Sequence, residues 1–200
     1  MANIPIVNYP AFTAGLAHAS NLLQPYFTNF RATFGGVPDE RGLTDMFLYD
    51  LAFTSQVNVQ YGRSTTAQEA ITGCDFGFTY LNGNKNNQEN TILLQAKSFK
   101  NANDDQDPVA DFTYKSRNAA DIQMNVLNNY ITNLKNQHQN DHITGGYILY
   151  GTNGAIFVPI GTLITEYNNI AQGHTPDQIN EELSRLFWRD RALYPLTGFF

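Results

Sequence analysis

The pattern of apolar and polar positions predicts two helices in the first quarter of the chain. Apolar residues recur at helical spacing over residues 13–30, although Pro25 should kink or divide this helix. A second amphipathic stretch predicts a helix over residues 40–54, after a Gly-Pro-rich connector at residues 35–38. Asp39 directly precedes this second helix and is expected to cap it.

Alternating positions then predict extended structure. Residues 57–61 alternate, and residues 66–71 are expected to form a second extended stretch. Residues 73–81 and 91–99 read as the two strands of a hairpin, joined by the polar segment 82–90. The middle of the chain is therefore expected to contribute several strands to one sheet.

The second half of the chain returns to a helical pattern before two further strands. An acidic, solvated loop at residues 101–107 is followed by a predicted long helix over residues 116–137. Strands are expected at 146–150 and 155–160, joined by an Asn-Gly turn, and a last helix at 177–186. This order predicts an α/β fold with a mixed central β-sheet flanked by helices.

Composition narrows the class of protein without identifying it. Two hundred residues, 42% of them hydrophobic, fit one domain with a sizeable core. A net charge of −6 and a pI near 5.0 argue against nonspecific coating of nucleic acid, but an acidic metal site would also lower the pI. Cys74 is the single cysteine, which suits a reducing compartment, and its apolar neighbours predict a buried structural thiol.

Targeting signals do not stand out in the sequence. No apolar run approaches the about 20 residues that a membrane span requires. The first residues lack a basic segment followed by an apolar one, so no signal peptide is expected. We therefore expect a cytoplasmic protein that does not enter a membrane.

The predicted hairpin carries the most informative chemistry. Because side chains alternate between the faces of a strand, Asp75 and Gly77 share one face, and Gln95 and Lys97 share one face of the next strand. A roughly symmetric connection would place Asp75 opposite Lys97 and Gly77 opposite Gln95. A carboxylate, an amide and an ammonium are then expected to converge on one patch of the sheet. A simple cross-strand ion pair is the structural alternative.

An aspartate followed on the next strand by Gln95-Ala96-Lys97 resembles the PD-(D/E)XK nuclease superfamily, which has the restriction-endonuclease-like fold. Members carry an aspartate on one core strand and an acid-x-Lys triplet on the next, within an α-β-β-β-α-β core. The resemblance covers about residues 40–160. It implies a single nuclease-like domain over residues 1–200 with a restriction-endonuclease-like core and helical additions at both ends.

The resemblance also implies roles for individual residues. Asp75 matches the metal-binding aspartate and Lys97 the catalytic lysine, while Gln95 stands where most members have an acid. Triplets of the Gln-x-Lys kind resemble the Mrr-type branch. The implied activity is that of an endonuclease that hydrolyses phosphodiester bonds, with DNA preferred over RNA. Mg²⁺, or Mn²⁺, would be held by Asp75, Gln95 and the carbonyl of Ala96.

Gln95 leaves the site one acid short, and two residues could supply it. Glu69 precedes Asp75 by six residues, about 20 Å along a straight strand, so a bend near Gly73 would be needed to bring it back. Glu40 begins the second predicted helix, where relatives of this superfamily place an acid. The sequence does not choose between Glu69 and Glu40.

Further residues could contact the substrate. Lys100, Lys115 and Arg117 follow the predicted site and could meet phosphates, and Gln123 of the long helix could face the site. Nucleases that cut both strands are often homodimers, although no interface can be recognised here. Two other functions stay open: a catalytically silent nuclease fold that binds nucleic acid or protein, and a structural or assembly protein.

Overall fold

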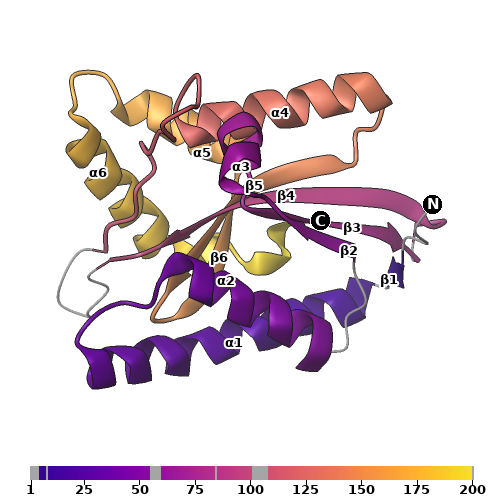
Figure 1. Cartoon of the computed structure of the whole chain (residues 1–200), viewed down its shortest axis with the longest axis horizontal. Coiled ribbons are helices and arrows are strands. Elements are labelled where there is room, and N and C mark those ends of the chain that lie inside the picture. Colours follow the sequence, from indigo (N-terminus) through magenta and orange to yellow (C-terminus); the bar gives the residue numbers. More distant parts are fainter. Residues whose placement is uncertain (1–4, 8, 55–59, 84, 101–107, 200) are drawn as a thin grey trace.

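The structure, a computed structural model, describes residues 5–7, 9–54, 60–83, 85–100 and 108–199. One six-stranded mixed sheet lies between two layers of helices (Figure 1). The predicted α/β class with a mixed sheet flanked by helices is confirmed. Most of the strand predicted at 57–61 and the loop predicted at 101–107 lie outside the described residues.

The sheet has the spatial order β1-β3-β4-β5-β6, and β2 also pairs with β3. β3 is antiparallel to β2 and β4, whereas β4 and β5 run parallel and β6 returns antiparallel to β5. The short β1 pairs in parallel with the end of β3. The strands are β1 (Ile6–Val7), β2 (Gln60–Arg63), β3 (Phe76–Asn82), β4 (Gln88–Ser98), β5 (Ile143–Gly151) and β6 (Gly154–Pro159).

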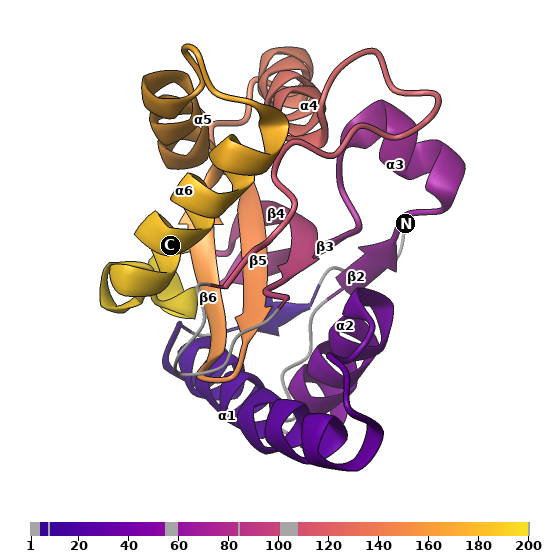
Figure 2. The same cartoon turned by 90° about the vertical axis from the view of Figure 1, so that its left-hand side faces the viewer.

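The helices divide between the two faces of the sheet. α1 and α2 cover one face, and α3, α4, α5 and α6 lie on the other (Figures 1 and 2). α2 continues into one turn of π-helix over Asp50–Thr54. The helices are α1 (Tyr9–Phe34), α2 (Glu40–Tyr49), α3 (Thr66–Thr72), α4 (Gln123–His138), α5 (Ile160–Ile170) and α6 (Pro176–Arg189).

Two apolar cores fill the space above and below the sheet. Phe76 and Phe78 of β3 point toward α1 and α2, as the alternation predicts. Cys74 is buried, as expected, but it packs against α4 in the other core instead of beside Phe76. Cys74 precedes β3, so the alternation of the strand does not extend to it.

Residues 66–71, predicted to be extended, instead form α3. The helix begins with a capping box: the Thr65 hydroxyl accepts from the Gln68 N–H, and the Gln68 side chain accepts from the Thr65 N–H. It ends at Gly73, whose φ of 65° places it in the left-handed region. Two local end signals therefore outweigh the extended pattern that the sequence suggested.

Two helix predictions need correction. α1 runs without interruption over 26 residues, so Pro25 does not divide it. The helix predicted from Ser116 begins only at Gln123, because the chain before it turns and the Gln123 N–H bonds to the Tyr114 carbonyl at 2.9 Å.

α5 was not predicted, since its apolar residues continue the apolar run of β6. The Asp39 cap is confirmed by a 2.9 Å bond from the Arg41 N–H.

The hairpin pairs in a register two residues away from the predicted one. Gly77 lies opposite Leu93 and Phe76 opposite Leu94, so Gly77 does not face Gln95 as expected. The turn is centred on Lys85, between the paired Asn82 and Gln88, whereas the predicted connection 82–90 is centred on residue 86. Asn86 and Asn87 adopt left-handed conformations in this turn, with φ of 52° and 56°. The shift of two residues leaves each side chain on the predicted face.

Candidate functional site

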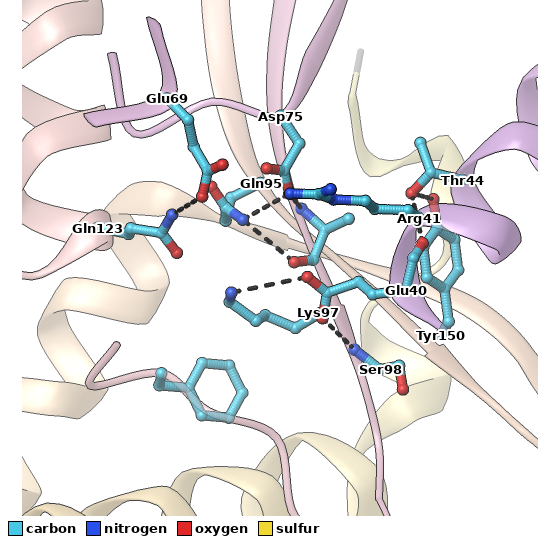
Figure 3. Close-up of polar contacts among 12 residues, drawn as sticks. Glu40, Arg41, Thr44, Glu69, Asp75, Gln95, Lys97, Ser98, Gln123 and Tyr150 are labelled. Atoms are coloured by element: carbon cyan, nitrogen blue, oxygen red, sulfur yellow. Dashed lines mark hydrogen bonds and ion pairs between the residues drawn. The ribbon is translucent and has the colours of Figure 1, made fainter. Parts of the chain in front are cut away.

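A cavity of about 620 Å³ lies beside the start of β3 and the end of β4. α2 and α3 contribute to its wall, together with residues 111–116. Figure 3 shows acidic side chains from α2, α3 and the start of β3 gathered around the Lys97 ammonium. Six residues that the sequence singled out line this cavity: Glu40, Glu69, Asp75, Ala96, Lys97 and Lys100.

Asp75 lies directly before β3 and is held by β4. Its Oδ2 accepts a 2.8 Å bond from the Ala96 N–H and a second bond from the Gln95 side-chain amide. Asp75 is therefore paired with Gln95, and the expected position opposite Lys97 is not adopted. Both bonds go to one carboxylate oxygen, so Oδ1 accepts no hydrogen bond from the residues that the structure describes.

Burial dominates the electrostatics of Asp75. It raises the pKa of the carboxyl to about 7, and the charges of Glu69 and Glu40 act in the same direction. The Ala96 N–H and the Lys97 ammonium lower the pKa but do not offset burial. Asp75 is thus a carboxylate whose ionised form needs additional positive charge near neutral pH.

Glu40 is the first residue of α2, and the helix directs it toward β4. Its Oε2 accepts the Ser98 N–H at 3.1 Å, and its Oε1 lies 3.7 Å from the Lys97 Nζ. Burial raises the pKa of Glu40, while the nearby Lys97 lowers it. Glu40 therefore supports the ammonium and also contributes a carboxylate to the cavity.

Glu69 reaches the cavity because the chain reverses after α3. The chain bends at Gly73, as expected, but Glu69 lies on the helix α3 before the bend and not on a strand. A Cβ at Gly73 would lie 2.5 Å from the Leu127 backbone nitrogen, so α3 can approach α4 this closely only at a glycine. The Gln123 amide of α4 then donates to Glu69 (Figure 3).

Lys97 is held at the edge of the cavity by its surroundings. Its side chain is 9% exposed, and the ammonium lies 4.9 Å from the centre of the Tyr114 ring. Tyr114 was not anticipated from the sequence. Asn180 of α6 holds the segment that leads to Tyr114, because the Asn180 side-chain oxygen accepts from the N–H groups of Phe112 and Thr113 at 2.9 and 3.1 Å.

Of the four residues expected to contact the substrate, only Lys100 lines the cavity. Lys100 lines the cavity and is exposed. Lys115 and Arg117 lie outside the lining, and Lys115 donates to the Ala120 carbonyl at 3.0 Å. Gln123 is buried and bonded to Glu69, so its position is that of a support for the acid.

Two arginines that the sequence reasoning missed also line the cavity. Arg41 comes from α2, and Arg63 ends β2, where it forms an ion pair with Asp45. Arg41 follows the Asp39 cap by two residues, which is a usable sequence signal for a side chain near the helix start. Arg63 has no such signal, because its position depends on the pairing of β2 with β3.

Acidic side chains alone do not provide a complete set of ligands for a hard cation in this cavity. Within the described residues, no three His, Cys, Asp or Glu side chains are grouped closely enough to hold a metal ion together. Gln95, expected to be a metal ligand, lies outside the cavity lining: its amide nitrogen donates to Asp75 and to the Ala96 carbonyl, and its buried Oε1 has no hydrogen-bond partner among the described residues. The oxygens of Asp75 and the Ala96 carbonyl, which line the cavity, are hard donors. These groups, completed by one nearby acid and by water, fit Mg²⁺ or Mn²⁺.

Comparisons with other proteins place the chain in a family without assigning it an activity. Within the described part of the chain, no helix combines the length and apolar character needed to cross a membrane. The search of curated proteins found no match. Residues 18–177, which are four-fifths of the chain, match a family model described as a family of unknown function, DUF6615. The protein is therefore a member of the DUF6615 family.

Proposed function

We propose that this protein is a metal-dependent endonuclease of the PD-(D/E)XK type that hydrolyses phosphodiester bonds in DNA. The observation that carries the proposal is the shared cavity: Asp75, Ala96 and Lys97 line it together with both candidate acids. These residues come from α2, α3, β4 and the start of β3, so their convergence is not a consequence of sequence proximity.

The order of elements supports the same proposal. α2, β2, β3, β4, α4 and β5 follow one another along the chain, which matches an α-β-β-β-α-β core with α3 inserted before β3. β3 and β4 are antiparallel, and β5 is added in parallel to β4 after the α4 crossover. A restriction-endonuclease-like core accounts for this arrangement and for the position of the site.

In the proposed site, Asp75 and the Ala96 carbonyl would hold Mg²⁺ or Mn²⁺, and Glu69 or Glu40 would complete the acidic set. The metal ion, when bound, would act as a Lewis acid on the phosphoryl group and lower the pKa of a bound water. The Gln95 amide orients Asp75 by donating to its Oδ2. The Gln123 amide holds Glu69 in the same way.

Lys97 would orient the attacking water and stabilise the charge that develops on the phosphoryl oxygens. Its ammonium is confined between Glu40 and the ring of Tyr114, so it can keep one direction during the reaction. Arg41, Arg63 and Lys100 give the cavity further positive charge for a polyanionic strand.

Plasmid nicking tests the proposal directly. The wild-type protein should cut DNA in Mg²⁺ or Mn²⁺ and fail to cut in EDTA. Lys97→Ala and Asp75→Ala should both abolish cleavage, whereas Lys85→Ala, in the distant hairpin turn, should cut normally. Circular dichroism must show that each variant is folded. Undiminished cleavage by folded Lys97→Ala protein would refute the assigned site.

A catalytically silent relative that only binds nucleic acid or protein is the second candidate. It is favoured by Gln95, which places a neutral amide against Asp75 where an acid would strengthen metal binding. Such a protein would bind oligonucleotides, with or without metal, and would leave plasmid DNA intact in both Mg²⁺ and Mn²⁺. The nicking assay therefore separates the two candidates.

A further inference from the structure

A second cavity, of about 370 Å³, adjoins the proposed active site. It lies on the face of the sheet that carries α3 and α4 (Figure 2), and Arg63 and Ser64 line both cavities. Its volume is within the range of small-ligand sites. The two cavities are therefore neighbours that share Arg63 and Ser64 as a common border.

The register of β2, β3 and β4 determines the floor of the cavity. Gln60, Thr79 and Thr91 lie opposite one another and form a polar row, in which the two threonine hydroxyls are 3.2 Å apart. Alternate residues share a face, so this row is on the same face as Asp75, about 13 Å from it along β3. The proposed cleavage site and the polar row thus lie at two ends of one strip of sheet.

The strip between these two ends consists of two glycines and a leucine. Gly62 and Gly77 are paired across β2 and β3, and the Leu93 side chain of β4 packs over Gly77, where an added Cβ would lie 3.0 Å from Leu93 Cδ2. Gly62 is open, because an added Cβ there would meet nothing within 4 Å. Tyr130 of α4 also lines the cavity. An open backbone position beside an apolar side chain and an aromatic residue suits a planar group.

The lining differs in charge from the active site. Arg63 is its one charged residue among those that the structure describes, and the other polar groups are hydroxyls and amides. The active site, in contrast, is lined by carboxylates and cations. Neutral donors and acceptors beside the apolar Leu93 and the aromatic Tyr130 match the edge and the face of a nucleobase, whereas the charged cavity matches its phosphate.

We propose that the second cavity binds a nucleobase of the DNA strand next to the phosphodiester bond that is cut. The proposal rests on the proposed nuclease function and adds a substrate preference to it. A base can enter the cavity only when it is unstacked and unpaired. The protein therefore prefers single-stranded DNA, or duplex DNA with unpaired bases, to intact duplex.

Gly62→Leu provides a clean test because it fills the cavity. A Cβ at Gly62 meets nothing within 4 Å and the residue does not have a left-handed φ, so a side chain can begin there without a backbone clash. Gly161→Leu is the matched control, since Gly161 of α5 is equally unobstructed and lies outside both cavities. Tyr130→Leu removes the aromatic wall and keeps apolar bulk.

Binding is measured first, independently of catalysis. Fluorescence anisotropy of a labelled single-stranded oligonucleotide in EDTA should give a Kd about tenfold higher or more for Gly62→Leu and Tyr130→Leu than for the wild type. Gly161→Leu should bind like the wild type. Unchanged binding by both cavity variants would overturn the proposal.

Cleavage distinguishes this proposal from the nuclease proposal. In Mg²⁺, a single-stranded oligonucleotide should be cut faster than the same sequence in a duplex, and an abasic nucleotide beside the cut should remove the advantage. Cleavage by the wild type that is indifferent to strandedness and to the abasic nucleotide would refute the base site and leave the nuclease intact. Weakened binding by Gly62→Leu without any cleavage by the wild type would support the base site and refute the nuclease.

Discussion

Replacing Asp75 with asparagine should stabilise the metal-free protein at neutral and alkaline pH. Burial raises the pKa of this carboxyl from 3.8 to about 7, so the folded protein holds a proton that the unfolded chain releases. The stability that protonation provides is complete below pH 3.8 and is lost as the pH rises through about 7. The asparagine side chain does not titrate and should avoid this loss.

The structure sets the size of the effect. A pKa raised from 3.8 to about 7 corresponds to about 4 kcal/mol once the carboxylate is fully ionised. Asparagine can keep both native contacts, since the Ala96 N–H and the Gln95 amide bond to the same oxygen of Asp75. For a chain of 200 residues, this free energy raises Tm by about 10 °C at pH 8.5 relative to the wild type.

Thermal unfolding in EDTA, followed by circular dichroism from pH 4.5 to 8.5, measures the difference. The Tm of Asp75→Asn should exceed that of the wild type increasingly as the pH rises, while Asp141→Asn, at an exposed carboxylate, should follow the wild type. Mg²⁺ at pH 8.5 should then raise the Tm of the wild type more than that of Asp75→Asn. Parallel Tm profiles for Asp75→Asn and the wild type would refute the argument.

Three further substitutions or reactions test the surrounding structure. Gly73→Ala should lower the free energy of unfolding by about 3 kcal/mol in urea titrations, since its φ is 65° and its Cβ would collide with the α4 backbone. Asn180→Leu should lower stability by about 1–3 kcal/mol by leaving the N–H groups of Phe112 and Thr113 without their acceptor; unchanged urea midpoints would contradict this. Burial raises the pKa of the Cys74 thiol to about 12, so a thiol reagent should label the protein only after unfolding.

The strands were more predictable than the short helix. Strands β3 to β6 follow from alternation and from turn residues such as Asn153-Gly154. α3 is seven residues long, too short for a helical period to outweigh an extended pattern. Thr65 and Gln68, three residues apart, were nevertheless a readable capping box. In this segment the capping box and the C-terminal Gly73 indicate the helix better than the periodicity does.

Asp75 and Lys97 lie on the same face of the sheet, as predicted, although the predicted register is wrong. The hairpin is shifted by two residues, and the period of a strand is also two, so Asp75 and Lys97 stay on the predicted face. A shift of one residue would have separated them. Contacts such as those of Tyr114 and Asn180 could not be predicted, because they depend on how α6 packs beside residues far from it in the sequence.

Gln95 acquires a physical explanation from the groups around it. Glu40 and Glu69 already raise the pKa of Asp75, so a further carboxylate at position 95 would oppose the ionisation of Asp75 still more strongly. The amide of Gln95 instead donates a hydrogen bond to Asp75, which favours its ionised form. The negative charge that the triplet lacks is supplied by the first turn of α2 and by α3. In the proposed nuclease, those two helices, and not β4, therefore determine how strongly the site attracts a cation.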